Sequence, residues 1–501
     1  MSAAAGAGDA QYRKMTQTPI PRLVATLAVP TIISMLVTAV YNMADTFFVA
    51  QLGTSAAGAV GIVFSLMAVI QAIGFMLGMG AGNLVSRYLG AKEQRQADCA
   101  ASTAFFTALA FGLGITVLGT LFLDPLMRVL GATPTILPYA RDYARYILFG
   151  APVMCASFVL NNILRGEGKA MLAMVGIGLG GVLNIGLDPL FIYTFGLGIA
   201  GAAIATLLSQ CVSFAILLAC FLRRKSAVRL HIGQVSRKAE VYARIIKTGM
   251  PSFCRQSLAS VATVLLNVNA AVYGDAAVAA MSVVGRIFMF VFSFMLGFGQ
   301  GFQPVAGYNF GAKRYDRVRG ATYFTMLVGT VLMSVLAAAG FLAAPGALAL
   351  FRRDDAEVIA IGALALRAQC VVLPLFGVST VTNMLLQVTG QSGQATFLSL
   401  CRQGIFFVPF ICAVHSAAAA AHRAFGRAAR PARGRPVYLR GDASVFAFIP
   451  AAAEAVGTGG TCCGGKIRIW KSRGDSPRLC SFLLLQFPRF FRQTHFDGFH
   501  F

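Results

Sequence analysis

The amino-acid sequence predicts an all-α polytopic membrane protein with two six-helix lobes related by pseudo-two-fold symmetry. Three observations support this fold class. Long apolar segments follow one another along most of the chain, the loops between them alternate in charge, and the first half of the chain repeats in the second. The composition agrees, because 57% of the 501 residues are hydrophobic and only 12% are charged, whereas a soluble domain carries about 25% charged residues.

Apolar segments of about 20 residues or more are long enough to cross the hydrocarbon core of a bilayer. Ten such segments lie at about 23–50, 57–86, 97–123, 137–164, 170–194, 198–222, 243–270, 277–307, 318–345 and 359–388, and an eleventh begins near residue 396. We expect each of them to form a transmembrane helix, because a helix satisfies its own backbone hydrogen bonds inside the bilayer.

The loops between these segments alternate between a basic set and a neutral or mixed set. The basic set comprises the leader, the loops after the second, fourth and eighth segments, and the long stretch 223–247. Loops rich in Lys and Arg stay in the cytoplasm, so the alternation predicts a cytoplasmic N-terminus. Membrane proteins accumulate Lys and Arg in cytoplasmic loops, so we expect no nucleic-acid partner despite the net charge of +24.

The two halves of the chain resemble each other on either side of the polar stretch 223–247. A shift of 221 residues aligns GMGAGNLVSRYLGAKEQRQA (78–97) with GQGFQPVAGYNFGAKRYDRV (299–318), and RGEGKA (165–170) has a looser counterpart in TGQSGQA (389–395). An even number of segments separates the copies, so the repeats run parallel about an axis along the membrane normal. Two lobes related in this way are typical of transporters.

The stretch Asn184-Ile185-Gly186-Leu187-Asp188-Pro189 places an amide and a carboxylate on one helix face inside an apolar segment. Pro189 also frees a backbone carbonyl one turn earlier. A carboxylate at membrane depth costs at least about 2.5–3.5 kcal/mol, so its default interpretation is a functional group that faces protein or water. The alternative is that Asp188 caps the helix end in the membrane interface.

A second carboxylate, Asp45, lies in the first segment, and the repeat places Leu266 at the matching position of the second half. Asp45, Asn184 and Asp188 together offer oxygen ligands of the kind that hard cations such as Na⁺ prefer. Two neighbouring carboxylates in a low dielectric can equally carry a proton. Thr206 can add a hydroxyl group; its alternative role is a hydrogen bond to its own helix backbone.

Other kinds of chemistry lack support in the sequence. The spans contain no Walker A sequence, no Ser/His/Asp arrangement and no zinc-ligand spacing. We therefore expect neither a self-contained ATP-driven pump nor an enzyme, and no cofactor besides the coupling ion. The Gly-x-Gly pairs at 78–80 and 299–301 lie in apolar segments without a preceding strand, which favours close helix packing over phosphate binding.

Several segments in order resemble the multidrug and toxic compound extrusion (MATE) family. They are PTIISMLVTAVYNMADTFFVAQLG (30–53), the two Gly-Ala-Lys loops, NIGLDPLFIY (184–193) and SLCRQGIFFVP (399–409). The resemblance covers about residues 20–410 and is to the DNA-damage-inducible branch. It implies two six-helix lobes around a cavity that opens alternately to each side of the bacterial cytoplasmic (inner) membrane. It also implies that Asp45, Asn184, Asp188 and Thr206 form a cation site in the N-lobe.

The regular pattern stops after about Ala413. We expect a cytoplasmic leader (1–22), an N-lobe (23–222), a cytoplasmic linker (223–247), an incomplete C-lobe (248–413) and an aberrant basic tail (414–501). The apolar runs of the tail are too short to span, so a twelfth helix is lost or replaced. Our hypothesis is that the reading frame shifts near residues 411–415; a genuine basic cytoplasmic extension is the alternative.

The resemblance further implies a multi-pass secondary exporter that exchanges H⁺ or Na⁺ for small cationic or amphipathic drugs. It would act as a monomer among membrane lipids, and Asp45 and Asp188 would bind the cation from outside. Two alternatives remain open. One is a flippase for a lipid-linked precursor, which would have a large basic cavity, whereas the central spans here hold few Lys or Arg residues. The other is a membrane protein that no longer transports because its C-terminus is altered.

Overall fold

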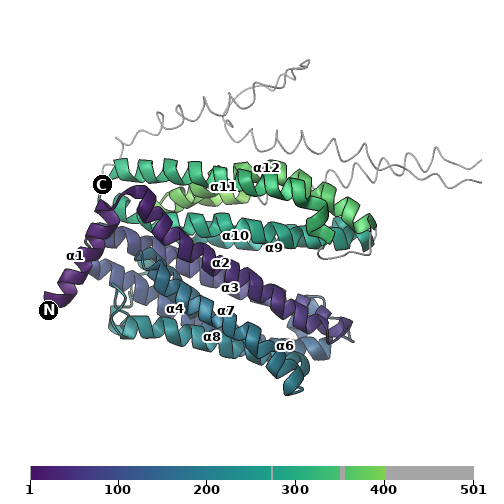
Figure 1. Ribbon diagram of the computed structural model, residues 1–501. Coiled ribbons are helices and arrows are strands. Elements are labelled where there is room, and N and C mark those ends of the chain that lie inside the picture. Colours follow the sequence, from purple (N-terminus) through teal and green to yellow (C-terminus); the bar gives the residue numbers. More distant parts are fainter. Residues whose placement is uncertain (1, 272–274, 350–355, 402–501) are drawn as a thin grey trace, which may run out of the picture. The chain divides into compact units, whose positions relative to one another are not determined.

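The structure, a computed structural model, describes residues 2–271, 275–349 and 356–401 (Figure 1). The first half of the chain forms the helices α1 (Ser2–Gln17), α2 (Ile20–Ala50), α3 (Thr54–Gly90), α4 (Gln94–Leu121), α5 (Leu123–Val129), α6 (Leu137–Gly166), α7 (Ala170–Pro189), a π-helical turn η1 (Leu190–Thr194) and α8 (Gly198–Leu222). The second half forms a 3₁₀ turn η2 (Ile232–Gln234), α9 (Ala239–Ala271), α10 (Asp275–Gly311), α11 (Tyr315–Ala349), α12 (Ala356–Val388) and α13 (Ser392–Leu400).

The ten predicted spans from 23–50 to 359–388 coincide with long helices, and the predicted eleventh begins within the short helix α13. Nine helices of that part are long and apolar enough to cross a membrane. The predicted leader (1–22) contains the helix α1 and the beginning of α2. The tail 414–501, the proposed frame shift near 411–415 and the twelfth helix lie outside the described residues.

The internal repeat is visible in the backbone. Lys92 and Lys313, which are 221 residues apart, both have a positive φ, 63° and 58°. Further along the chain the offset becomes 222. Asn161 donates to the carbonyl oxygen of Ala173 at 2.9 Å, and Asn383 donates to that of Ala395 at 2.8 Å. The counterpart of residues 165–170 is therefore 387–392, two residues earlier than the sequence alignment placed it.

The two halves contact each other reciprocally through α3 and α10. A side chain at Gly90 would collide with the carbonyl oxygen of Tyr308, and a side chain at Gly311 would collide with that of Arg87. Both residue pairs are related by the offset of 221. The pseudo-two-fold axis thus passes between α3 and α10, where glycine lets the two backbones approach closely.

These contacts lie at the end of the helices that carries the basic loops, which we call the basic end. It comprises the loops 91–93, 167–169, 223–238 and 312–314. Helix α1 binds both halves there. Asn309 donates to the carbonyl oxygen of Met15 at 3.1 Å and Arg317 donates to that of Thr18 at 2.5 Å, while Gln11 donates to the carbonyl oxygen of Glu167 at 2.7 Å.

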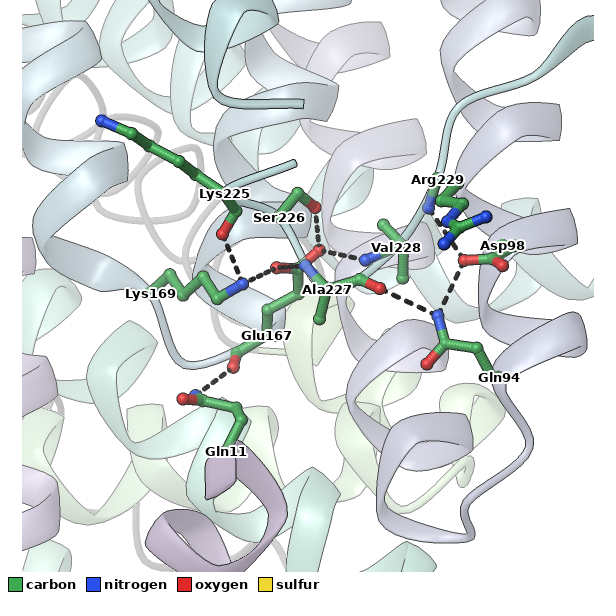
Figure 2. Close-up of polar contacts among 10 residues, drawn as sticks. All are labelled: Gln11, Gln94, Asp98, Glu167, Lys169, Lys225, Ser226, Ala227, Val228 and Arg229. Carbon is green, nitrogen blue, oxygen red and sulfur yellow. Dashed lines mark hydrogen bonds and ion pairs between the residues drawn. The ribbon is translucent and has the colours of Figure 1, made fainter. Parts of the chain in front are cut away.

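The stretch that joins the halves is held to the basic end by two carboxylates (Figure 2). Glu167, whose side chain is fully buried, accepts hydrogen bonds from the Ser226 hydroxyl group at 2.5 Å and from the backbone of Ala227 at 2.7 Å and of Val228 at 3.1 Å. It also pairs with Lys169 at 3.3 Å. Asp98 of α4 accepts from the backbone of Arg229 at 2.8 Å.

Replacing Glu167 tests this attachment. In Glu167→Ala, three buried or half-buried donors lose their acceptor and Lys169 loses its ion-pair partner. We expect the free energy of unfolding to fall by about 3–5 kcal/mol, as for other broken buried ion pairs. The melting temperature of the purified protein in detergent measures the effect.

Glu240→Ala is the matched control, because Glu240 pairs with Arg244 on the surface of α9 and its side chain is 72% exposed. Exposed pairs contribute little, so its melting temperature should stay at the parent value. Equal melting temperatures for Glu167→Ala and the parent protein would contradict the attachment.

Candidate functional site

Three helices of the first half bring the predicted polar residues together. Asp45 comes from α2, Asn184 and Asp188 from α7, and Thr206 from α8. The structure adds Tyr143 of α6, which the sequence analysis did not identify. We call these five residues the acidic cluster.

Hydrogen bonds connect the acidic cluster across helices. The Asn184 amide donates to Asp188 Oδ1 at 3.1 Å and faces Thr206 Oγ1 at 3.4 Å. The Tyr143 hydroxyl group donates to Asp45 Oδ2 at 3.5 Å and lies close to Asp188 and Thr206 as well. Thr206 therefore contacts a neighbouring helix, which favours its expected role over the alternative of a bond to its own backbone.

Glycines of α7 let the helix approach its neighbours so closely. A side chain at Gly181 would lie 2.9 Å from Val37 of α2, and one at Gly180 would lie 3.0 Å from the carbonyl oxygen of Ser209 of α8. Asn184, one helical turn further on, is thereby held between the polar groups of α2 and α8.

The end of α7 follows from Pro189. The ring removes a backbone donor, α7 ends there, and the π-helical turn η1 continues the chain. Such turns often occur at functional sites. Asp188 lies just before this turn and is fully buried, with its carboxylate bonded to Asn184. Asp188 thus lies at the end of its helix, and its burial favours the interpretation of a group that faces protein.

Three buried oxygen atoms of the acidic cluster have no hydrogen-bond partner among the described residues. They are Asp45 Oδ1, Asn184 Oδ1 and Asp188 Oδ2. Buried polar atoms without a partner are costly, so acceptor oxygens in this setting favour a bound cation or proton. Two carboxylates, an amide and a hydroxyl group are hard oxygen ligands, which suit Na⁺. The described residues contain no group of three or more His, Cys, Asp or Glu side chains able to hold a metal ion.

Tyr143 was missed because its sequence carries no distinguishing signal. It lies among the charged and aromatic residues of Asp142-Tyr143-Ala144-Arg145-Tyr146 near the start of α6. Tyrosine is common at membrane interfaces, so nothing in this segment separates a buried tyrosine from an interfacial one. Only the packing of α6 against α8, together with the hydrogen bond from Tyr143 to Asp45 of α2, reveals its role.

Comparison with known proteins identifies the family of the chain. A family model described as MatE matches residues 30–190 and 251–412, one copy in each half. The chain belongs to the MatE family. Asp45, Asn184 and Asp188 lie inside the first matched segment of this MatE protein, and Thr206 lies beyond its end.

Relatives of this MatE protein include exporters from two staphylococci. The chain is 26% identical over 404 residues to the multidrug export protein MepA of Staphylococcus aureus, a match that covers 80% of this chain and 89% of MepA. It is 27% identical over 386 residues to MepA of Staphylococcus saprophyticus, covering 77% of this chain and 85% of that protein.

Solved structures of similar proteins share the fold. One is the outward-facing conformation of a multidrug resistance MATE family transporter of the MOP superfamily, with a TM-score of 0.75, 31% identity, and 78% of this chain and 88% of that chain covered. Another is a MOP superfamily transporter from Pyrococcus furiosus, with a TM-score of 0.76, 30% identity, and 81% and 90% covered. The predicted all-helical, two-lobe membrane fold is therefore confirmed.

Proposed function

We propose that this MatE protein is a multidrug efflux transporter that couples export to the inward movement of H⁺ or Na⁺ through the acidic cluster. The observation that carries the proposal is the set of three unpartnered buried oxygens on Asp45, Asn184 and Asp188 in a chain of this family. The multidrug export proteins among its relatives support drug substrates. Small cationic or amphipathic compounds are the class we expect, handled by a monomer surrounded by lipid.

The acidic cluster explains how a cation can drive the cycle. Its ligands come from α2, α6, α7 and α8, so a bound cation draws these helices together and neutralises a buried carboxylate. A ligand shifts a conformational equilibrium only by its difference in affinity for the two states. Cation binding from outside therefore favours the state that releases drug outward, and the two lobes then exchange access.

The basic end sets the orientation in this proposal. Loops rich in Lys and Arg remain in the cytoplasm, which supports an orientation with the basic end and the N-terminus on the cytoplasmic side of a bacterial inner membrane. The close contacts between α3 and α10 then close the cytoplasmic side of the pathway.

The substrate class requires its own test. The Pyrococcus furiosus transporter is described as having a binding pocket of reverse polarity that suggests a different function, so one fold of this superfamily serves more than one substrate class. A panel of cationic, neutral and anionic compounds in the efflux assay below separates drug export from movement of a lipid-linked precursor.

Replacing Asp188 by Asn tests the coupling site. The amide keeps the shape of the side chain but can neither carry a proton nor supply a charged ligand. We expect Asp188→Asn to lose at least about 90% of energised drug efflux from cells, measured with and without Na⁺ at several pH values. If efflux by the parent protein depends on Na⁺, the coupling ion is Na⁺; if it depends on pH alone, the coupling ion is H⁺.

Asp124→Asn is the matched control, because Asp124 pairs with Arg141 at 3.7 Å outside the acidic cluster and its side chain is 45% exposed. This variant should keep the efflux of the parent protein. Full efflux by Asp188→Asn at parent expression levels would contradict the coupling role of the acidic cluster.

Tyr143→Phe keeps the ring and removes only the hydroxyl group that bonds Asp45. Hydrogen bonds to charged groups contribute about 1.5–3 kcal/mol, so the cation concentration for half-maximal efflux should change about tenfold while the KM for drug stays constant. Tyr139→Phe, at an exposed position of the same helix, should change neither value. An unchanged cation dependence in Tyr143→Phe would place its hydroxyl group outside the site.

A further inference from the structure

A second buried polar cluster lies between the two halves, away from the acidic cluster. It surrounds a small cavity that is lined by α3 and α6 of the first half and by α10 of the second. The cavity has room for a small particle such as one water molecule. Its polar lining residues are Asn83, Asn162, Arg165, Gln300 and Gln303. Asn83, Arg165 and Gln300 carry buried nitrogen atoms without partners among the described residues, and we call these three the donor cluster.

Arg165 brings a positive charge to this cavity. The residue is only 5% exposed, and its Nη1 atom donates to Gln300 Oε1. Its Nε and Nη2 atoms have no acceptor in the described part of the chain. None of the ion pairs formed between described residues includes Arg165. A buried cation ordinarily requires a counter-charge, because desolvation without pairing is costly.

The other members of the donor cluster also present N–H groups without acceptors. Asn83 Nδ2 and Gln300 Nε2 are buried and unpartnered among the described residues. The orientation of the Gln300 amide is fixed, since its oxygen accepts the bond from Arg165. The unpartnered atoms of the acidic cluster are all oxygens, whereas those of the donor cluster are all nitrogens. These unpartnered N–H groups, together with the positive charge of Arg165, match a ligand that only accepts hydrogen bonds.

The internal repeat shows that the fold does not require this charge. The offset of 222 that relates Asn161 to Asn383 relates Arg165 to Gln387. Gln387 is fully buried and neutral. Its oxygen accepts from Gln303 at 3.2 Å, and its nitrogen donates to the carbonyl oxygen of Thr248 at 3.0 Å and to Ser252 Oγ at 2.9 Å. Protein groups thus satisfy the hydrogen bonds of Gln387. Arg165 lacks such protein partners for two of its nitrogen atoms, so a bound ligand is needed to accept from them.

We propose that Arg165, Asn83 and Gln300 bind one small monovalent anion of the size of chloride in the cavity between the halves. The anion bridges α3 and α6 of the first half to α10 of the second. It therefore binds tightly only while these helices are together at the basic end, and it stabilises that arrangement over one in which the halves part there.

Thermal unfolding of the full-length protein in detergent tests the proposal. Sodium chloride is compared with sodium gluconate, whose anion is too large for the cavity, at equal ionic strength. We expect saturating chloride to raise the melting temperature by about 2–4 °C and gluconate to leave it unchanged. An equal rise in both salts, or no rise with chloride, would overturn the proposal.

Two variants locate the anion. Arg165→Gln copies the neutral residue of the second half and should abolish the chloride shift, while Arg367→Gln, which removes an arginine outside the cavity, should keep it. Gln300→Glu places a carboxylate beside Arg165 and should also make the melting temperature independent of chloride. If Arg165→Gln fails to fold, Gln300→Glu decides: a chloride shift that persists in this variant overturns the site.

Discussion

The close approach of α3 and α10 is the constraint on which the rest of the structure depends. Gly90 meets the backbone of Tyr308, and Gly311 meets the backbone of Arg87. Because these contacts are exchanged by the internal repeat, they fix the position of the pseudo-two-fold axis and hold the halves together at the basic end. Helix α1 hydrogen-bonds to residues of both halves near this junction. The buried cavity beside Arg165 is likewise lined by residues of both halves.

The repeat also shows where the two halves have diverged. The second half holds its equivalent positions with neutral side chains, such as Gln387, whose polar atoms are satisfied by protein. The first half places charges there and in the acidic cluster, namely Arg165, Asp45 and Asp188, and leaves some of their polar atoms without protein partners. Unpartnered buried atoms cost stability, and in our two proposals bound ions supply the missing partners of these charged groups.

The sequence predicted the fold and much of the acidic cluster because both depend on strong local signals. Span length and hydropathy located the helices, and the spacing of Asn184 and Asp188 placed both on one face. Tyr143 was missed because its position beside Asp45 depends on how α6 packs, which no local pattern encodes. The donor cluster was missed for the same reason: Arg165 followed an apolar segment and was counted with the basic loops, whereas the structure buries it against Gln300. The change of offset from 221 to 222 became evident only through the paired bonds of Asn161 and Asn383.

Transport by the purified protein in liposomes tests the central claim most directly. Drug uptake is followed while an outward gradient of H⁺, of Na⁺ or of neither is imposed, with no nucleotide present. Cation-coupled exchange through the acidic cluster predicts uptake that accelerates with one of the two gradients and stops when that gradient is dissipated. Uptake that proceeds at the same rate with either gradient and without any gradient would contradict the account.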